Sequence, residues 1–214
     1  MRLGVVVAAG GRAERYGAGD KLAADLGGRT LLERTLAALP AHAAVVCVGP
    51  TVPTSRPVTW VREDPPHSGP LAAVAAGVPG LPREVTAVAL VGGDMPAAGR
   101  LLPSLAYALA ASGTGAPPAS RPDPGPAQCA LAVDPSGQRQ PLLSVWRRDR
   151  LETRLAALAP VADQPVRVLL DGIVVREVPA PTSLTADVDT QDDLARLRAQ
   201  EAAAPPPGAG SPDG

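Results

Sequence analysis

Apolar residues fall along the chain in short runs, bounded by glycine, proline and polar turn residues, and this pattern is typical of buried strands. Many of the runs are rich in valine, whose branched side chain suits a pleated sheet. The runs predict strands over Leu3–Ala9, Val45–Val48, Val58–Val61, Val85–Val91, Gln128–Val133, Pro141–Trp146, Val166–Leu169 and Ile173–Val178. The turn residues Asp134–Gly137 separate the fifth run from the sixth, which indicates a hairpin.

Segments with helical periodicity lie between these runs. In Leu31–Leu39, for example, the apolar positions repeat at three- and four-residue spacing and so share one helix face. Helices are predicted over Leu31–Leu39, Leu71–Val78, Arg100–Ala111, Arg148–Leu158 and Asp192–Ala204, the last with Thr190 as its N-cap. Strands that alternate with helices predict an α/β fold: a Rossmann-like, doubly wound, mostly parallel sheet with helices on both faces.

The pattern indicates one domain over residues 1–204 and two segments outside its core. Residues 112–127 are rich in proline and glycine and carry no periodicity, so we interpret them as a flexible surface insert. Strand-like sequence resumes directly after it, and the insert is therefore not a domain boundary. Residues 205–214 are predicted to be a disordered tail.

Composition narrows the class of partner. Apolar residues make up 45% of the 214 residues, while phenylalanine is absent, so the core must consist of alanine, valine and leucine. A formal charge of −1 gives no strong field for nucleic acid, and no stretch reaches the roughly 20 apolar residues of a membrane span. Cys47 and Cys129 lie in apolar runs without metal-ligand spacing, which indicates buried, reduced thiols. A small-molecule partner and a cytoplasmic location are expected.

The segment after the first strand carries the strongest chemical signal. The predicted strand ends with Ala8 and Ala9, and Gly10 and Gly11 open the loop that follows, at the sheet edge where open α/β folds bind ligands. Glycines let backbone N–H groups approach a ligand closely. Three cations follow within ten residues: Arg12, Arg15 and Lys21. Amide donors together with cations are what a triphosphate requires.

Two common phosphate motifs do not fit this segment. The dinucleotide fingerprint needs G-x-G-x-x-G, but Gly10 and Gly11 are adjacent and the next glycines are Gly17 and Gly19. The P-loop needs glycine and then lysine with serine or threonine, whereas Lys21 follows Asp20 and precedes leucine.

The segment instead resembles the signature of the molybdenum-cofactor nucleotidyltransferases, roughly L-A-G-G-x-x-x-R-M-G-x-x-D-K followed by G-x-x-L. The chain has Ala8–Gly11, Arg15-Tyr16-Gly17, Asp20-Lys21 and Gly28–Leu31 at matching spacing, with Tyr16 in place of methionine. The resemblance implies a fold of the nucleotide-diphospho-sugar transferase type. It implies that Arg15 and Lys21 act on the triphosphate and that Ala8, Ala9, Gly10, Gly11, Arg12 and Lys21 bind the nucleotide.

An acidic residue at the end of a later strand supplies the expected metal ligand. Asp94 follows the run Val85–Val91 and precedes Met95-Pro96, and a carboxylate beside a phosphate loop can hold Mg²⁺. An ordinary turn or helix cap would show the same pattern. The segment also resembles the C-D-x-P motif of the family, whose aspartate binds magnesium, with Gly93 in the cysteine position.

Two further segments resemble family motifs. Ser68–Ala72 is similar to G-P-L-A-G, which implies that Gly69 lies beside the nucleotide and that Asp64 accepts hydrogen bonds from guanine; a salt-bridged surface aspartate is the alternative. Asp187–Leu194 is similar to N-x-[ND]-T-P-E-[DE]-L, which implies that Asp187 or Asp189 is a second metal ligand, with helix capping as the alternative. The hairpin around Asp134 would line the acceptor side. His42 and His67 have no partners at catalytic spacing.

The reaction implied is the transfer of a nucleotide from an NTP to a phosphorylated acceptor, with Mg²⁺ as cofactor and release of pyrophosphate. The resemblance implies GTP and molybdopterin as partners, since Asp20 precedes Lys21 where the cytidylyltransferase branch of the family usually has proline. A cytidylyltransferase, a sugar-phosphate or phospholactate nucleotidyltransferase, and a non-catalytic nucleotide-binding module remain as alternatives. Neither nucleic acid nor a membrane is expected as a partner.

Overall fold

Seven strands form a single sheet in the order β3-β2-β1-β4-β6-β5-β7. This computed structural model describes residues 1–10, 16, 20–111 and 126–203. The strands comprise β1 (Leu3–Ala8), β2 (Ala44–Val48), β3 (Thr59–Val61), β4 (Ala87–Gly92), β5 (Cys129–Val133), β6 (Arg139–Arg147) and β7 (Val175–Pro179). β1 pairs in parallel with β2 on one side and β4 on the other, while β6 runs antiparallel between β4 and β5. The mostly parallel sheet predicted from the sequence is confirmed.

The strand order reverses its direction between β1 and β4. From β1 the chain moves outward through β2 to β3, and then returns to place β4 on the opposite side of β1. Such a switch point leaves a crevice at the carboxyl ends of the two strands, and ligands of open α/β sheets bind there. The residues that follow β1 and β4 therefore lie where a substrate site is expected.

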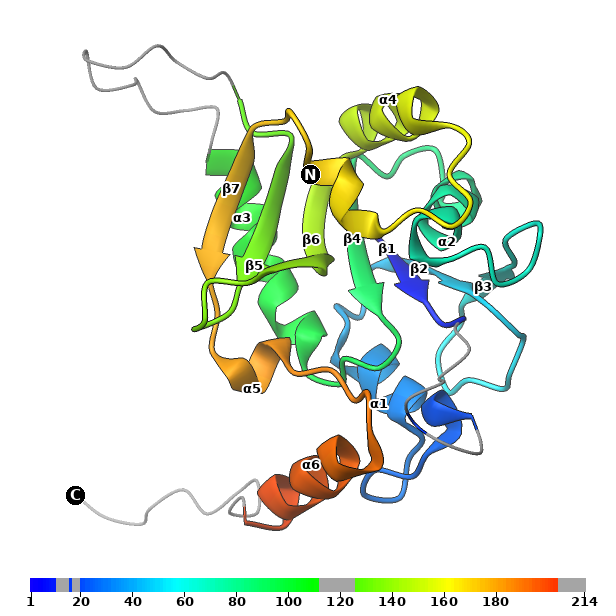
Figure 1. Cartoon of the computed structure of the whole chain (residues 1–214), viewed down its shortest axis with the longest axis vertical. Helices are drawn as coiled ribbons and strands as arrows, with labels where there is room; N and C mark the ends of the chain where they lie inside the picture. Colours follow the sequence, from blue (N-terminus) through cyan, green and yellow to red (C-terminus); the bar gives the residue numbers. More distant parts are fainter. Residues whose placement is uncertain (11–15, 17–19, 112–125, 204–214) are drawn as a thin grey trace.

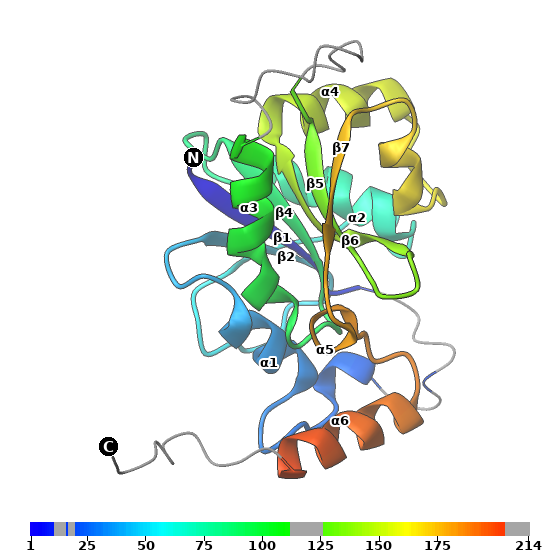
Figure 2. The same cartoon turned by 90° about the vertical axis from the view of Figure 1, so that its left-hand side faces the viewer.

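Helices cover both faces of the sheet, as Figures 1 and 2 show. The helices of the described residues are α1 (Leu31–Ala38), α2 (Pro70–Gly77), α3 (Leu102–Ala111), α4 (Arg148–Leu158), α5 (Thr182–Thr185) and α6 (Gln191–Ala203). The 3₁₀ turns of the same residues are η1 (Lys21–Ala23), η2 (Val78–Gly80), η3 (Ala98–Leu101) and η4 (Val166–Leu170). Leucines of α1 and α3 pack on one face of the sheet, and those of α2 and α4 pack on the other. Both layers consist mainly of alanine, valine and leucine, as the composition predicted.

The last two helices lie at the carboxyl ends of the parallel strands, at the bottom of Figure 1. A small apolar cluster connects the N-terminal and C-terminal segments at this end of the molecule. Its buried members are Tyr16, Leu26, Leu31, Val188 and Leu194. The C-terminal segment is thereby held beside the residues that follow β1.

One predicted strand is wrong. Val166–Leu169 belongs to the 3₁₀ helix η4, because its carbonyl groups have partners outside the sheet: Arg154 donates to the carbonyls of Val168 and Leu169, at 2.7 and 3.3 Å. Four apolar residues cannot distinguish a strand from a short buried helix by periodicity. The prediction also omitted α5.

The other predicted strands and helices are confirmed to within a few residues, including the hairpin of β5 and β6. Both cysteines are buried and free. Residues 112–125 of the predicted insert and residues 205–214 of the predicted tail lie outside the described part of the chain. No helix in the described part of the chain is both long and apolar enough to cross a bilayer.

Candidate active site

Two chain segments meet at the switch point. Lys21 opens the 3₁₀ turn η1, whose N-cap Asp20 accepts a hydrogen bond from the backbone of Leu22 at 2.9 Å. Asp94 comes two residues after β4. A backbone hydrogen bond of 2.9 Å from Gly93 to Ala8 ties the end of β4 to the end of β1. Lys21 and Asp94, two of the three residues predicted to be catalytic, are therefore brought together by strands that are adjacent in the sheet. The third, Arg15, lies outside the described residues.

The Lys21 ammonium bridges two carboxylates. Its Nζ lies 2.6 Å from Oδ2 of Asp94 and 3.0 Å from Oδ1 of Asp189. The side chains of Lys21 and Asp94 are largely buried, at 14% and 23% exposure, while that of Asp189 is 47% exposed. Hydrogen bonds between charged groups are stronger than neutral ones, so this bridge fixes all three side chains.

The third carboxylate, Asp187, lies in the same segment as Asp189. The backbone N–H of Val188, between the two, donates to the carbonyl of Asp94 at 3.1 Å. Asp193 accepts hydrogen bonds from the backbone of Asp189 and Thr190, and Thr190 accepts one from Asp193 in return, which forms a cap at the start of α6. The predicted cap at Thr190 is confirmed, and it fixes the backbone of the carboxylates.

The environment changes how two of these groups titrate. Burial alone would lower the pKa of Lys21, but attraction to Asp94 and hydrogen bonds to Asp94 and Asp189 outweigh it and leave that pKa above its ordinary value. The pKa of Asp187 is also raised, first by loss of water around the carboxyl and then by repulsion from Asp189 and Asp94. Lys21 is therefore an ammonium ion at neutral pH, and Asp187 loses its proton less readily than an ordinary aspartate.

The position of Asp94 depends on the two glycines before it. A side-chain carbon on Gly92 would lie 2.6 Å from Oδ1 of Asp94, and one on Gly93 would lie 3.0 Å from the carbonyl oxygen of Ala8. Thr35, buried on α1, donates to the carbonyl of Gly93 at 2.9 Å. The carboxylate thus occupies space that a larger residue would fill.

The donor set fits a divalent cation. Mg²⁺ prefers oxygen ligands and is usually bound by one or two carboxylates together with water and substrate phosphates. Asp94 and Asp189 already converge on a single atom of Lys21. Within the described part of the chain, no group of three or more His, Cys, Asp or Glu forms a metal site. A cation here would therefore take its remaining ligands from triphosphate and water.

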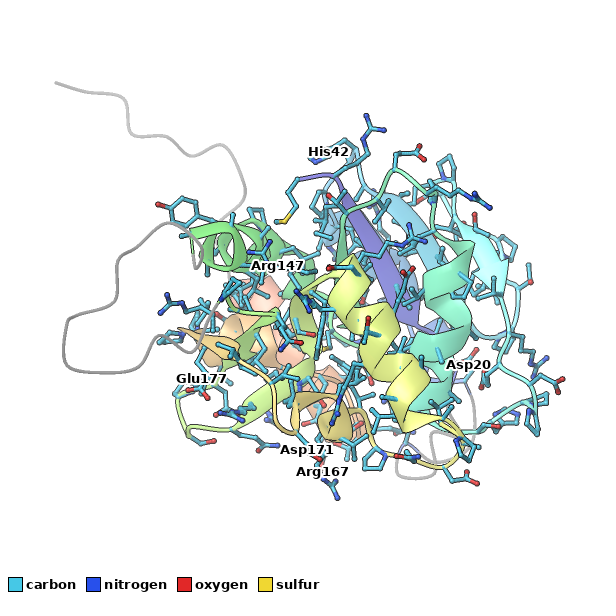
Figure 3. All side chains as sticks on the ribbon, turned by 90° about the horizontal axis from the view of Figure 1, so that it is seen from above. Asp20, His42, Arg147, Arg167, Asp171 and Glu177 are labelled. Carbon is cyan, nitrogen blue, oxygen red and sulfur yellow. The ribbon has the colours of Figure 1, made fainter. Side chains whose placement is uncertain are left out.

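The predicted nucleotide-binding residues are only partly covered. Ala8 and Ala9 are tied into the end of the sheet, and Gly10 is exposed beyond it. Gly69 has a φ of 91° and precedes α2, whose first turn has no side-chain cap. Gly11, Arg12 and Arg15 lie outside the described residues, so their predicted roles remain predictions. Figure 3 shows His42 at the rim of the molecule, where it is exposed in the turn before β2.

A buried glutamate lies beside the predicted base-binding aspartate. Asp64 is exposed, whereas Glu63 is 7% exposed. Oε1 of Glu63 accepts a hydrogen bond from the backbone of His67 at 3.0 Å and would lie 3.5 Å from a side-chain carbon on Gly10. Its buried Oε2 has no hydrogen-bond partner among the described residues.

The sequence interpretation did not include Glu63, because adjacent acidic residues give no sign of which one is buried. A second signal was available at Lys21. It is the only lysine in the sequence, which otherwise uses arginine at its cationic positions. At this one position the chain has the compact ammonium of lysine, on a flexible stem, in place of the planar guanidinium of arginine.

A family model for the MobA-like NTP transferase domain matches residues 5–178. The chain belongs to this family. It is accordingly a nucleotidyltransferase, and the family assignment made from the glycine loop is confirmed. Comparison with curated proteins gives no match.

Solved structures share the fold at low identity. A 2-C-methyl-D-erythritol 4-phosphate cytidylyltransferase from Thermus thermophilus is 18% identical with a TM-score of 0.66, over 94% of this chain and 98% of its own. Molybdopterin-guanine dinucleotide biosynthesis protein A from Archaeoglobus fulgidus is 17% identical with a TM-score of 0.62, over 94% and 99%. The manganese complex of Rv0371c from Mycobacterium tuberculosis is 18% identical with a TM-score of 0.62, over 93% and 99%.

Proposed function

We propose that the protein transfers GMP from GTP to the phosphate of molybdopterin, with Mg²⁺ as cofactor and release of pyrophosphate. The observation that carries this proposal is the convergence of Lys21, Asp94 and Asp189 at the switch point, with distances of 2.6 and 3.0 Å. A mobile cation and two carboxylates in one place are the parts that a metal-bound triphosphate needs.

We assign metal binding and triphosphate binding to different residues of the chain. Asp94 and Asp189 hold the cation, with Asp187 beside them, while Lys21, Arg12 and Arg15 bind the triphosphate oxygens. When bound, Mg²⁺ supplies positive charge to the phosphates as they react. An oxygen of the acceptor phosphate attacks the α-phosphorus of GTP, the bond to the bridging oxygen of the β-phosphate breaks, and pyrophosphate leaves. Because the attacking phosphate is already anionic, no strong general base is required.

Guanine is proposed as the base for a chemical reason. Its Watson–Crick edge presents N–H donors, and carboxylates accept them. The segment Glu63–Asp64 offers two carboxylates, one of them buried against Gly10 with an oxygen to spare. Transfer of CMP is the second candidate, because the Thermus cytidylyltransferase shares the fold at a TM-score of 0.66.

Pyrophosphate release tests the reaction. The protein is incubated with each of the four NTPs and Mg²⁺, with molybdopterin or with sugar phosphates as acceptor. We expect release with GTP and molybdopterin, and its loss in Lys21→Ala and Asp94→Asn. Arg2→Gln, which removes a cation at the opposite end of β1, is the matched control and should remain active. Release with CTP in place of GTP would select the second candidate, and NTP binding without release would indicate a non-catalytic module.

The base is tested separately with Glu63→Gln and Asp64→Asn. If a carboxylate of this segment accepts from guanine, one of the two variants will lose preference for GTP over CTP by about 10- to 100-fold, the effect of about 1–3 kcal/mol of discrimination at a charged hydrogen bond. Unchanged preference in both variants would contradict the assignment of guanine recognition to this segment.

A further inference from the structure

We propose that the Lys21 ammonium and a divalent cation are alternative partners of Asp94 and Asp189, and that a bound triphosphate frees the carboxylates by drawing Lys21 away. Lys21 is then a positioning residue for the two carboxylates when no metal is bound, as well as a ligand of the nucleotide. The inference rests on the proposed function, since it assumes that these carboxylates bind a metal.

The geometry makes the two cations exclusive. Lys21 Nζ lies between Oδ2 of Asp94 and Oδ1 of Asp189, within hydrogen-bond distance of both. A metal ion here would be held by the same two carboxylates. An ammonium and a metal ion held by the same two carboxylates would repel each other at close range. One must leave before the other binds.

Backbone hydrogen bonds hold the segments of Asp94 and Asp189 side by side without the help of a cation. The hydrogen bond from Val188 to Asp94 fixes the two segments against each other, and the cap by Asp193 fixes the backbone of Asp189. Two carboxylates, Asp94 and Asp189, therefore lie within hydrogen-bond distance of one ammonium, and Asp187 lies two residues before Asp189 in the chain. The ammonium of Lys21 is the counter-ion that this arrangement requires when no metal is present.

A lysine suits two alternative positions better than an arginine would. Its charge is a single point on a flexible four-carbon stem, whereas an arginine fork tends to hold carboxylates through two parallel hydrogen bonds. The stem of Lys21 starts at η1, directly after the loop that is predicted to hold the triphosphate. Phosphate oxygens would therefore compete with Asp94 and Asp189 for the same ammonium.

This competition predicts that nucleotide and metal bind cooperatively. A nucleotide that withdraws Lys21 raises the affinity for the metal, and by linkage the metal raises the affinity for the nucleotide by the same factor. The metal alone binds weakly because it must displace the ammonium without any compensating partner for it.

Binding of Mn²⁺, followed by the electron paramagnetic resonance signal of the free ion, tests the inference without turnover. Wild type, Lys21→Met and the charge-matched control Arg2→Gln are titrated with and without a GTP analogue that has a methylene group between the α- and β-phosphorus. Without nucleotide, we expect Lys21→Met to bind Mn²⁺ about tenfold tighter than wild type or the control, within the usual range of coupling between sites. The increase in affinity caused by the analogue should shrink in Lys21→Met by the same factor.

The single lysine gives a second readout in the wild-type protein. Isotope-labelled lysine contributes one side-chain ammonium signal, which should move when the analogue is added alone and when Mg²⁺ follows. This measurement decides the question if Lys21→Met fails to fold. Equal Mn²⁺ affinity of wild type and Lys21→Met, or a lysine signal unmoved by the analogue, overturns the inference and leaves the proposed transferase reaction intact. Absence of Mn²⁺ binding to wild type with the analogue present would overturn the inference together with the assignment of Asp94 and Asp189 as metal ligands, and pyrophosphate release tests the transferase reaction separately.

Discussion

Gly92 ends β4 and controls where the Asp94 carboxylate lies. A side-chain carbon at this position would be 2.6 Å from Oδ1 of Asp94, a distance that forces the flexible aspartate to move. We expect Gly92→Ala to leave the fold intact and to lower kcat for pyrophosphate release by about 100-fold, the effect of misplacing a reacting group by about 1 Å. Circular dichroism checks the fold. Activity close to that of wild type would show that the position of Asp94 does not matter.

Asp187 and Asp189 should affect stability in opposite directions. The pKa of Asp187 is raised in the folded protein, so its charged form opposes folding at pH values above that pKa, and this cost disappears below its ordinary value of 3.8. We expect Asp187→Asn to raise Tm at pH 7 and to lose this advantage as the pH falls through the raised pKa of Asp187 toward 3.8. Asp189→Asn should lower Tm at pH 7, because it removes a partner of Lys21. A lower Tm in Asp187→Asn at pH 7 would contradict the unfavourable environment that raises the pKa of Asp187.

The residues of the site could be predicted only where a motif fixes their spacing. Lys21 and Asp94 follow strands in a recognisable pattern, and the sheet brings them within 2.6 Å. Glu63 could not be predicted, since its burial depends on how the turn after β3 packs against Gly10. The choice between Asp187 and Asp189 was also open, and only the fold of the segment before α6 places Asp189 on the ammonium.

Helix α2 lies unusually close to the sheet at Gly77. A side-chain carbon there would be 2.5 Å from Cγ1 of Val6 and 2.9 Å from Cγ2 of Val48. Alanine has the better helix propensity by about 1 kcal/mol, but overpacking at a buried contact costs about 1–3 kcal/mol. We therefore expect Gly77→Ala to lower the free energy of unfolding in urea.

A double-mutant cycle provides the control for this contact. Val6→Ala leaves a cavity by itself, yet it should offset part of the damage when combined with Gly77→Ala, because the added methyl group then has space. Strictly additive effects of the two substitutions would show that Gly77 acts through something other than its contact with Val6.

Elements with a strong period could be predicted, and those set by local hydrogen bonds could not. The strands β1, β2 and β4 are buried on both faces, so each appears in the sequence as a continuous run of valine and other apolar residues that predicts a strand. η4 has the same kind of apolar run, but its carbonyls accept hydrogen bonds from Arg154 and not from a neighbouring strand. α5 has only four residues, too few for a period.

At the scale of the whole molecule, the site joins the two ends of the described chain. Lys21 lies near the start, Asp94 in the middle and Asp189 near the end, and the apolar contact of Val188 with the cluster around Leu31 holds the last segment in place. A ligand that bridges these residues binds only when all three segments are folded. Its binding energy is therefore added to the stability of the entire fold.

Thermal unfolding measures this linkage. With GTP and Mg²⁺ together at about 100 times their dissociation constant, binding adds about 2.7 kcal/mol, which corresponds to a rise in Tm of roughly 5–10 °C for a chain of this size. GTP without metal should raise Tm less, and Asp94→Asn should abolish the difference between the two conditions. Arg2→Gln should behave as wild type. If Asp94→Asn kept the full metal-dependent rise, Asp94 would not be a ligand of the cation, and the assignment of the metal to the switch point would be wrong.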